Sequence, residues 1–500
     1  MNTIIAAFIS ELTNRSISFL IDRHLKPTPY KKDGIQRLQW MLLRVHLMVE
    51  EADGRCLTNL ARLKQLNIVR RVMHKSYYML DTFIQHVPEQ VDKKEQDVSC
   101  SLSLSKLRPA KEVCFTTGSK YGTENLEEML ESLENTIAGM SEFLIFLRNY
   151  PPMFRQPYST YLLMEKCMFS RQMEMAQIIN FLLYEDDPGH FGILPIVGPG
   201  KVGKTALVEH VCRDKRVTDH FSHVIVLHNN EFREDNELKI RDGCRTKHQH
   251  GDSKEEKKLV IIELVGTIDE GAIRRLYSAL IQCSILRGSK VIITSQSGNI
   301  INIGTTYPLN LKFLSREAFW YFFKALVFGT AYPEEHPKLA SLAMAIFDEY
   351  FDQDTDKAFG GPFIFLNKTA MGLKSRVNAQ NWNKILECFK NNRQKNEPGF
   401  KKRLSHCTMN DDHIILQRVC DSTQYCVVDN HDRIALVNEE APKITLHDIL
   451  DGTGSVRPSK FDILVWESHL PPYHKYIYSC QILKFDCSVN KQGPKRKFLS

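Results

Sequence analysis

The sequence predicts a chain of several domains: an N-terminal α-helical bundle, a central α/β domain with a helical subdomain, and a small β-rich C-terminal region. Two patterns support this fold class. Apolar residues recur every three or four positions through the first 150 residues, which is the period of helices that bury one face. Short apolar runs that alternate with helical patterns follow, as in a parallel sheet covered on both faces.

Four amphipathic stretches fill the N-terminal region 1–150. The last one steps by four and three residues from Leu126 to Leu147, which is a heptad seam, and Pro151 follows it. Helices of this kind bury their stripes against one another, so we expect a coiled-coil four-helix bundle, with a partner-facing seam as the alternative. The four predicted helices cover 5–20, 38–49, 60–83 and 126–147, and the polar stretch 91–120 reads as a loop.

The rest of the chain divides into four segments. We expect a linker at 151–190 with a helix at 161–183, an α/β domain at 191–310, a helical subdomain at 311–397 and a β-rich region of unknown role at 398–500. The predicted strands of the α/β domain are 193–197, 224–227, 259–262 and 291–294. Helices are predicted at 339–350 and 381–391, and β-runs at 414–419, 425–428, 434–437 and 462–466.

Composition excludes several classes of protein. The excess of 66 Lys and Arg over 59 Asp and Glu is too thin, over 57.8 kDa, to indicate a nucleic-acid partner. No stretch approaches the roughly 20 apolar residues of a membrane span. The 13 Cys are odd in number and include no C-x-x-C pair, so we expect reduced thiols rather than a disulfide framework or a zinc site.

The strongest chemical signal is the stretch 198–205, which matches G-x-x-x-x-G-K-[ST] between a predicted strand and a predicted helix. Such a loop wraps its backbone amides around phosphate oxygens, and the helix N-terminus adds partial positive charge. Lys204 would bridge the phosphates and Thr205 would bind Mg²⁺. The candidate binding residues are Gly198, Pro199, Gly200, Lys201, Val202, Gly203, Lys204 and Thr205. The central domain is therefore predicted to be a P-loop NTPase domain.

The acid that would complete the magnesium site is Glu263, at the end of the strand predicted at 259–262. It is the candidate catalytic residue and, with Thr205, the candidate metal ligand. Glu is one methylene longer than Asp, and Leu264 follows where a second acid would orient the attacking water. We therefore expect nucleotide binding with weak or absent hydrolysis, because the loop supplies affinity while placement of water supplies rate.

The order of these motifs resembles that of the plant intracellular immune receptors with a coiled coil and an NB-ARC domain (coiled-coil NLRs), over about residues 1–395. The resemblance is carried by the coiled-coil stretches 1–23 and 52–83, the P-loop, the strands at 219–228, 259–265 and 288–297, the segment 360–362 in place of Gly-Leu-Pro-Leu, and 169–172 in place of the Gly-Arg-Glu linker. It implies that Ala206 and Pro362 also contact the nucleotide. This chain departs from the family at three places: the family has glycine at the position of Lys201, Asp-Asp at positions 263–264, and arginine at the position of Gln296.

In such receptors ADP and ATP favour closed and open states, so the resemblance implies a nucleotide switch in plant defence. It further implies protein partners for the helical bundle, by self-association or through another immune receptor, and a cytoplasmic location or a peripheral one at the plasma membrane. No leucine-rich repeat follows, so we expect a short or degenerate receptor. Two alternatives remain: an active ATPase that uses Glu263, and a nucleotide-free scaffold in which Lys201 fills the pocket with its own charge. The segment 446–448, which echoes a Met-His-Asp motif, lies in the predicted β-rich region.

Overall fold

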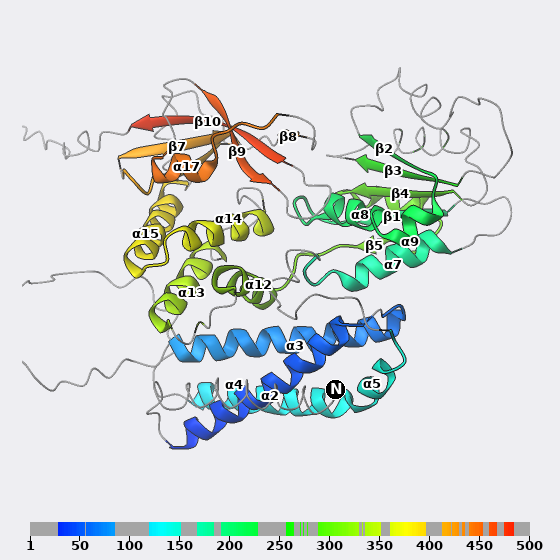
Figure 1. Ribbon diagram of the computed structural model, residues 1–500, viewed down its shortest axis with the longest axis horizontal. Coiled ribbons are helices and arrows are strands. Elements are labelled where there is room, and N and C mark those ends of the chain that lie inside the picture. Colours follow the sequence, from blue (N-terminus) through cyan, green and yellow to red (C-terminus); the bar gives the residue numbers. More distant parts are fainter. Residues whose placement is uncertain are drawn as a thin grey trace, which may run out of the picture. The chain divides into compact units, whose positions relative to one another are not determined.

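The structure is a computed structural model (Figure 1). It describes residues 29–55, 57–85, 120–151, 168–184, 192–228, 257–264, 271, 274, 278, 289–329, 333, 336–351, 361–396, 413–421, 423–429, 433–435, 440–453, 460–467 and 475–484. The chain divides into two compact units, Met1–Gln156 and Pro157–Ser500, which are described separately.

The first unit is α-helical, as the sequence predicts. Its helices are α2 (Pro29–Asp53), α3 (Leu60–Gln85), α4 (Lys120–Gly139) and α5 (Ser141–Leu147). The second and third predicted helices are thus confirmed, whereas the first, at 5–20, and most of the predicted loop at 91–120 lie outside the described residues. The core of the unit holds the stripe residues of the three long helices, among them Leu38, Leu42, Val45, Leu66, Val69 and Leu133.

The last predicted helix of this unit is not continuous, because α4 ends at Gly139 and α5 begins after Met140. Glycine is a weak helix former, costing about 1 kcal/mol relative to alanine. The amide of Met140 is shared between the carbonyl oxygens of Thr136 and Ile137, at 3.1 and 3.2 Å, which tightens the turn. The heptad seam survives this interruption, since Met140 and Leu147 are both buried.

The second unit begins with α7 (Gln172–Leu183). The prediction of one helix from 161 to 183 is wrong in its middle, because residues 168–171 are not helical; residues 152–167 lie outside the description. Ser170 takes a positive φ of 54°, which breaks a right-handed helix, and Arg171 becomes the N-cap.

A parallel sheet follows, with the order β2-β3-β4-β1-β5. Its strands are β1 (Gly192–Val197), β2 (His223–His228), β3 (Lys258–Leu264), β4 (Lys290–Ser295) and β5 (Leu309–Asn310). The four predicted strands are confirmed. The helices α8 (Lys204–Cys212) and α9 (Lys215–His220) join α7 in one apolar cluster against the sheet, and a second cluster includes Ile300 of the 3₁₀ helix η2 (Gly298–Ile303).

The predicted helical subdomain contains α12 (Arg316–Phe328), α13 (Pro337–Phe351), α14 (Pro362–Ser375) and α15 (Ala379–Asn396). Aromatic rings hold these helices together: Trp320 of α12 meets Phe347 of α13 at 5.3 Å between centroids, and Tyr350 stacks on Phe365 of α14 at 3.9 Å. The predicted helices at 339–350 and 381–391 lie within α13 and α15 and are confirmed.

The β-rich region forms what we call the C-terminal body: an antiparallel sheet with the order β6-β7-β10-β8, with β9 paired to β10, and one short helix, α17. The elements are β6 (His413–Gln417), β7 (Gln424–Asp429), β8 (Arg433–Ala435), α17 (Leu446–Asp451), β9 (Phe461–Glu467) and β10 (Lys475–Lys484). The segment 446–448 lies within this β-rich region, as predicted, and forms the start of α17 rather than part of a strand. Thr445 and Asp448 form a capping box, in which each side chain satisfies the other's backbone amide, and this starts a helix there.

Within the described part of the chain, no helix has both the length and the apolar character that crossing a membrane requires.

Candidate functional site

The candidate P-loop leaves the carboxyl end of β1 and enters α8, as its motif predicts. The amide of Gly198 donates to the carbonyl oxygen of Ser295 on β4 at 3.2 Å. A Cβ at Gly198 would lie only 2.3 Å from the carbonyl oxygen of Leu311, so only glycine fits where these backbones meet. The amide of Leu311 in turn donates to Val197 at 2.7 Å. The start of the loop is therefore fixed between the ends of β4 and β5.

The far end of the loop is built to receive an anion. Gly203 is the N-cap of α8 with φ 93° and ψ 28°. Among the described residues, no carbonyl oxygen accepts a hydrogen bond from the amides of Gly203, Lys204 or Thr205. Three such donors at a helix N-terminus suit a phosphate group, which also interacts favourably with the positive end of the helix dipole.

Lys204 closes the loop on itself. Its Nζ donates to the carbonyl oxygens of Gly198 at 2.7 Å and Pro199 at 2.8 Å, so the ammonium spans from the start of α8 to the start of the loop. Burial lowers the pKa of Lys204 to about 8, and the negative charge of Glu263 acts in the opposite direction. The structure thus brings Lys204 and Glu263 into one electrostatic neighbourhood, although 59 positions separate them in the sequence.

Glu263 lies at the carboxyl end of β3, in register with His228 of β2 and Thr294 of β4. Since all these strands are parallel, their carboxyl ends lie on the same side of the sheet, and the P-loop leaves β1 on that side. The Glu263 side chain is nearly buried, with 9% of its surface exposed. Leu264 follows as a buried apolar residue, so the position that would hold a second acid is filled by hydrocarbon.

The available ligands limit how a metal ion could be held. The residues that the structure describes include no cluster of three or more His, Cys, Asp or Glu that would suffice alone. Magnesium is usually held by one or two carboxylates, waters and the phosphates of its substrate. Thr205 and Glu263 would fill the protein's share of such a shell. The donors of the loop and this sparse pair of ligands both fit a nucleotide carrying magnesium.

Two further positions of the motif pattern meet the loop. The side-chain amide of Gln296 lies against Gly200, where a Cβ would be 3.2 Å from its Nε2. A neutral amide therefore occupies the place where the resembling family has arginine. Pro362 is buried at the first turn of α14, and the preceding Gly361 lies directly against Lys201. Val202 is buried and Ala206 is half-buried in the first turn of α8.

Backbone groups outside the motifs also shape the site. Ser295 holds the loop through its carbonyl oxygen and Leu311 through its amide, and sequence reasoning missed them because backbone groups are the same in nearly every residue. Arg171 is buried and donates to the carbonyl oxygen of Lys312 at 2.7 Å, which ties α7 to the connection between β5 and α12. Only the family linker motif marks this arginine in the sequence.

The parallel sheet, the glycine-rich turn and the lysine that closes it define a nucleotide-binding domain of the P-loop NTPase class. Residues 171–282 match the family description "NB-ARC domain". The chain is also 24% identical, over 358 residues, to disease resistance protein RGA2 of Solanum bulbocastanum. That match covers 68% of this chain and 35% of the relative, so the chain spans about a third of that protein's length. The chain thus carries an NB-ARC domain and is similar to a plant disease resistance protein.

Solved structures resemble the chain only weakly. A structure of C. elegans PCH-2 covers 48% of this chain and 70% of its own, at 12% identity and a TM-score of 0.30. Domain III of the Thermotoga maritima replication initiation protein DnaA covers 44% of this chain and 92% of its own, at 14% identity and a TM-score of 0.28. Both scores are too low to support an inference about this chain.

Proposed function

We propose that this chain is an ADP- or ATP-binding switch protein of plant innate immunity that hydrolyses its nucleotide weakly or not at all. The observation that carries the proposal is the closed P-loop, with Lys204 bonded across it and its helix-terminal amides available for phosphate. The NB-ARC match and the similarity to a disease resistance protein support the biological setting. We place the protein in the cytoplasm or peripherally at the plasma membrane.

The groups around the loop favour holding a nucleotide over splitting it. Thr205 and Glu263 would hold Mg²⁺, which supplies charge neutralisation for the phosphates when bound. Lys204 would orient the phosphates against the α8 amides. Hydrolysis also needs a group that positions water and one that stabilises the developing charge. At these places the chain has Leu264, which is buried and apolar, and Gln296, which is neutral.

The test is the nucleotide that the purified full chain releases on denaturation. We expect close to one ADP or ATP per chain for the wild type and almost none for Lys204→Ala. Lys215→Ala, which removes an exposed lysine from α9, is the matched control and should retain the wild-type amount. An empty wild type, or a Lys204→Ala protein with unchanged content, would refute nucleotide binding through this loop.

An active ATPase is the second candidate, and the placement of Glu263 beside Lys204 favours it. Steady-state turnover separates the two functions: a wild-type rate well above background that Glu263→Gln abolishes would establish the ATPase. The geometry does not favour the nucleotide-free scaffold. The Lys201 side chain is exposed and its Cβ and Cδ lie beside Gly361, so it runs along the start of α14.

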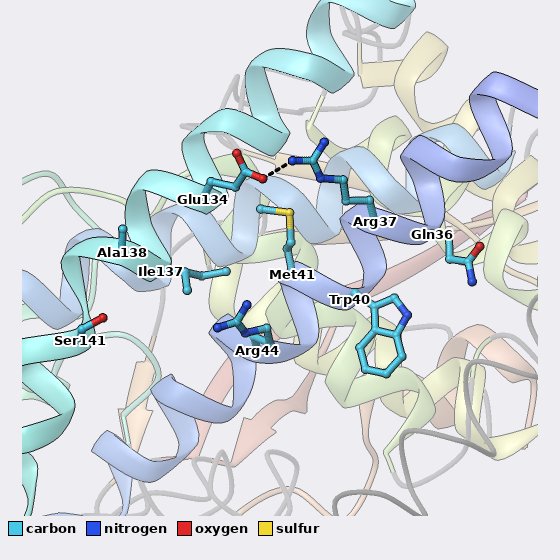
Figure 2. A pocket seen from close by; sticks show the side chains of 9 residues that line it. All are labelled: Gln36, Arg37, Trp40, Met41, Arg44, Glu134, Ile137, Ala138 and Ser141. Carbon is cyan, nitrogen blue, oxygen red and sulfur yellow. Dashed lines mark hydrogen bonds and ion pairs between the residues drawn. The ribbon is translucent and has the colours of Figure 1, made fainter.

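The helical unit offers a surface for the proposed protein partners, whether a second copy or another immune receptor. A groove of about 860 Å³ runs between α2 and α4 (Figure 2). Arg37 and Glu134 pair across one part of it, Trp40 is 42% exposed at its edge, and Arg44 follows one turn later. Tryptophan and arginine are the residue types that most often dominate binding energy in protein interfaces. Trp40→Ala should abolish any association seen by light scattering, while Trp40→Phe should largely preserve it.

A further inference from the structure

One face of α14 packs against the C-terminal body. Three residues spaced by four share this face, because such residues lie one above another on a helix. Ile364 packs into the apolar core of the body. The Nζ of Lys368 lies 5.6 Å from the ring centroid of Trp466 on β9. Gly372 lies under His447 of α17, whose Nδ1 would be 4.0 Å from a Cβ there.

The contact at Lys368 is the chemically distinctive one. A cation over an indole is attracted by the negative face of the ring. Burial lowers the pKa of Lys368 to about 8, while the charge of Asp448 on α17 opposes that change. Asp448 is itself held by hydrogen bonds from the amide and hydroxyl of Thr445, at 2.9 and 2.6 Å. The lysine therefore meets a rigid, electronegative surface made by α17 and β9.

The N-terminal end of the same helix lies against the P-loop. Gly361 caps α14 with φ 82°, and a Cβ at this residue would be 2.8 Å from the Cβ of Lys201 and 3.2 Å from its carbonyl oxygen. The helix continues without a break from this contact to Ser375, starting with the bond from the Phe365 amide to the Gly361 carbonyl at 3.0 Å. Seven residues of helix, about 10 Å along the axis, separate Gly361 from Lys368.

We propose that α14 transmits the docking of the C-terminal body to the phosphate loop, so that Lys368 and Trp466 set how long a bound nucleotide is retained. The inference rests on the proposed nucleotide binding and adds a regulatory role for the body, whose role the sequence leaves unknown. The helix is continuous, and the backbone of Gly361 at its end lies so close to Lys201 that a Cβ would not fit between them. Movement of α14 on the body therefore moves its end at Lys201. Aromatic contacts with α12 also hold α14, so the effect of one lost contact is partial.

The test measures release of a fluorescent N-methylanthraniloyl-ADP from the full chain after addition of excess ADP. Lys368→Met should release the nucleotide about two- to fivefold faster, which is the range that the loss of one cation–π contact allows. Lys368→Arg keeps the cation over the ring and should restore the wild-type rate. Lys374→Met removes a lysine from an exposed position of the same helix and should also release at the wild-type rate.

The release rate separates coupling from damage to the fold, since misfolding lowers the fraction of chains that bind but leaves the release from intact chains unchanged. Equal rates for the wild type and Lys368→Met would overturn the coupling alone. A wild type that binds no ADP would overturn the proposed function and the coupling together.

A second measurement needs no variant. Coupling between two sites is reciprocal, so ADP should slow amide hydrogen exchange in α17 and β9 of the wild-type chain. Unchanged exchange there, with ADP bound, would also overturn the coupling.

Discussion

The depressed pKa of Lys204 makes nucleotide affinity depend on pH in a direction that can be calculated. In the free protein, burial lowers this pKa to about 8 from the ordinary value near 10.5. A bound phosphate adds negative charge beside the ammonium and raises the pKa again, so the nucleotide binds the protonated form. The apparent affinity then follows the protonated fraction of the free protein.

The magnitude follows from that fraction. With a pKa of about 8, roughly 90% of the free chains carry the charge at pH 7 and roughly 10% at pH 9. The apparent dissociation constant for ADP should therefore rise about tenfold between pH 7 and pH 9, with most of the change above pH 8. A lysine with an ordinary pKa would give almost no change over this range.

Titration with fluorescent ADP at half-unit pH steps measures this dependence. Lys204→Arg is the matched control, because arginine stays charged throughout and its affinity should stay flat. Dividing the wild-type constants by those of the variant also removes any contribution from ionisation of the nucleotide. Parallel curves for the two proteins would show that Lys204 does not control the binding and would refute the reasoning.

Three other perturbations have expected outcomes. Gly198→Ala puts a Cβ 2.3 Å from a backbone carbonyl oxygen and should reduce ADP binding at least about tenfold, whereas Gly200→Ala meets only a flexible side chain at 3.2 Å and should bind nearly normally. The pKa of His74 is lowered to about 3, mainly by burial and further by its neighbours Arg70 and His46. The neutral His74 side chain contributes stability above pH 6.5, and this contribution is lost as the pH falls because the unfolded chain then binds the proton more readily. The free energy of unfolding of the helical unit should therefore fall by about 2 kcal/mol between pH 7 and pH 5. Amide hydrogen exchange in α3 should become faster over this range in the wild type but not in His74→Leu. Lys201→Gly should raise the free energy of unfolding without nucleotide by up to about 1 kcal/mol, measured with urea, because a lysine with φ 60° is strained; Lys201→Ala should give no such gain.

The sequence is most informative where one physical rule acts alone. β1, β3 and β4 are buried on both faces, so their apolar runs locate them to within one or two residues, and the P-loop motif marks its own strand and helix. The order of the strands does not follow from such runs. β4 lies between β1 and β3, so Glu263 reaches the site from two strands away rather than from a neighbouring strand.

The features that the sequence does not predict depend on competing local signals or on pairing with segments far away in the sequence. A short capping box starts α17 within a region of strand-like runs, and a single glycine and shared carbonyl bonds interrupt a continuous heptad seam at Met140. β10 is a long strand whose place is set by pairing with β7, β8 and β9, which lie up to about 60 residues away in the sequence. Such pairings cannot be deduced from the strand's own residues.

Backbone conformation at two positions bears on why binding could outlast hydrolysis. Among the described residues, the non-glycine residues with positive φ are Ser170, at 54°, and Lys201, at 60°. Both stand where the resembling family has glycine, one in the linker motif and one in the P-loop. The chain keeps the glycine-type conformation although an L-residue there costs roughly 1–2 kcal/mol. Surrounding contacts, such as Arg171 on Lys312, must therefore determine the path of the backbone. A phosphate cradle made of backbone amides tolerates side-chain change in this way, whereas the water-positioning and charge-sensing groups are side chains and are lost with a single substitution.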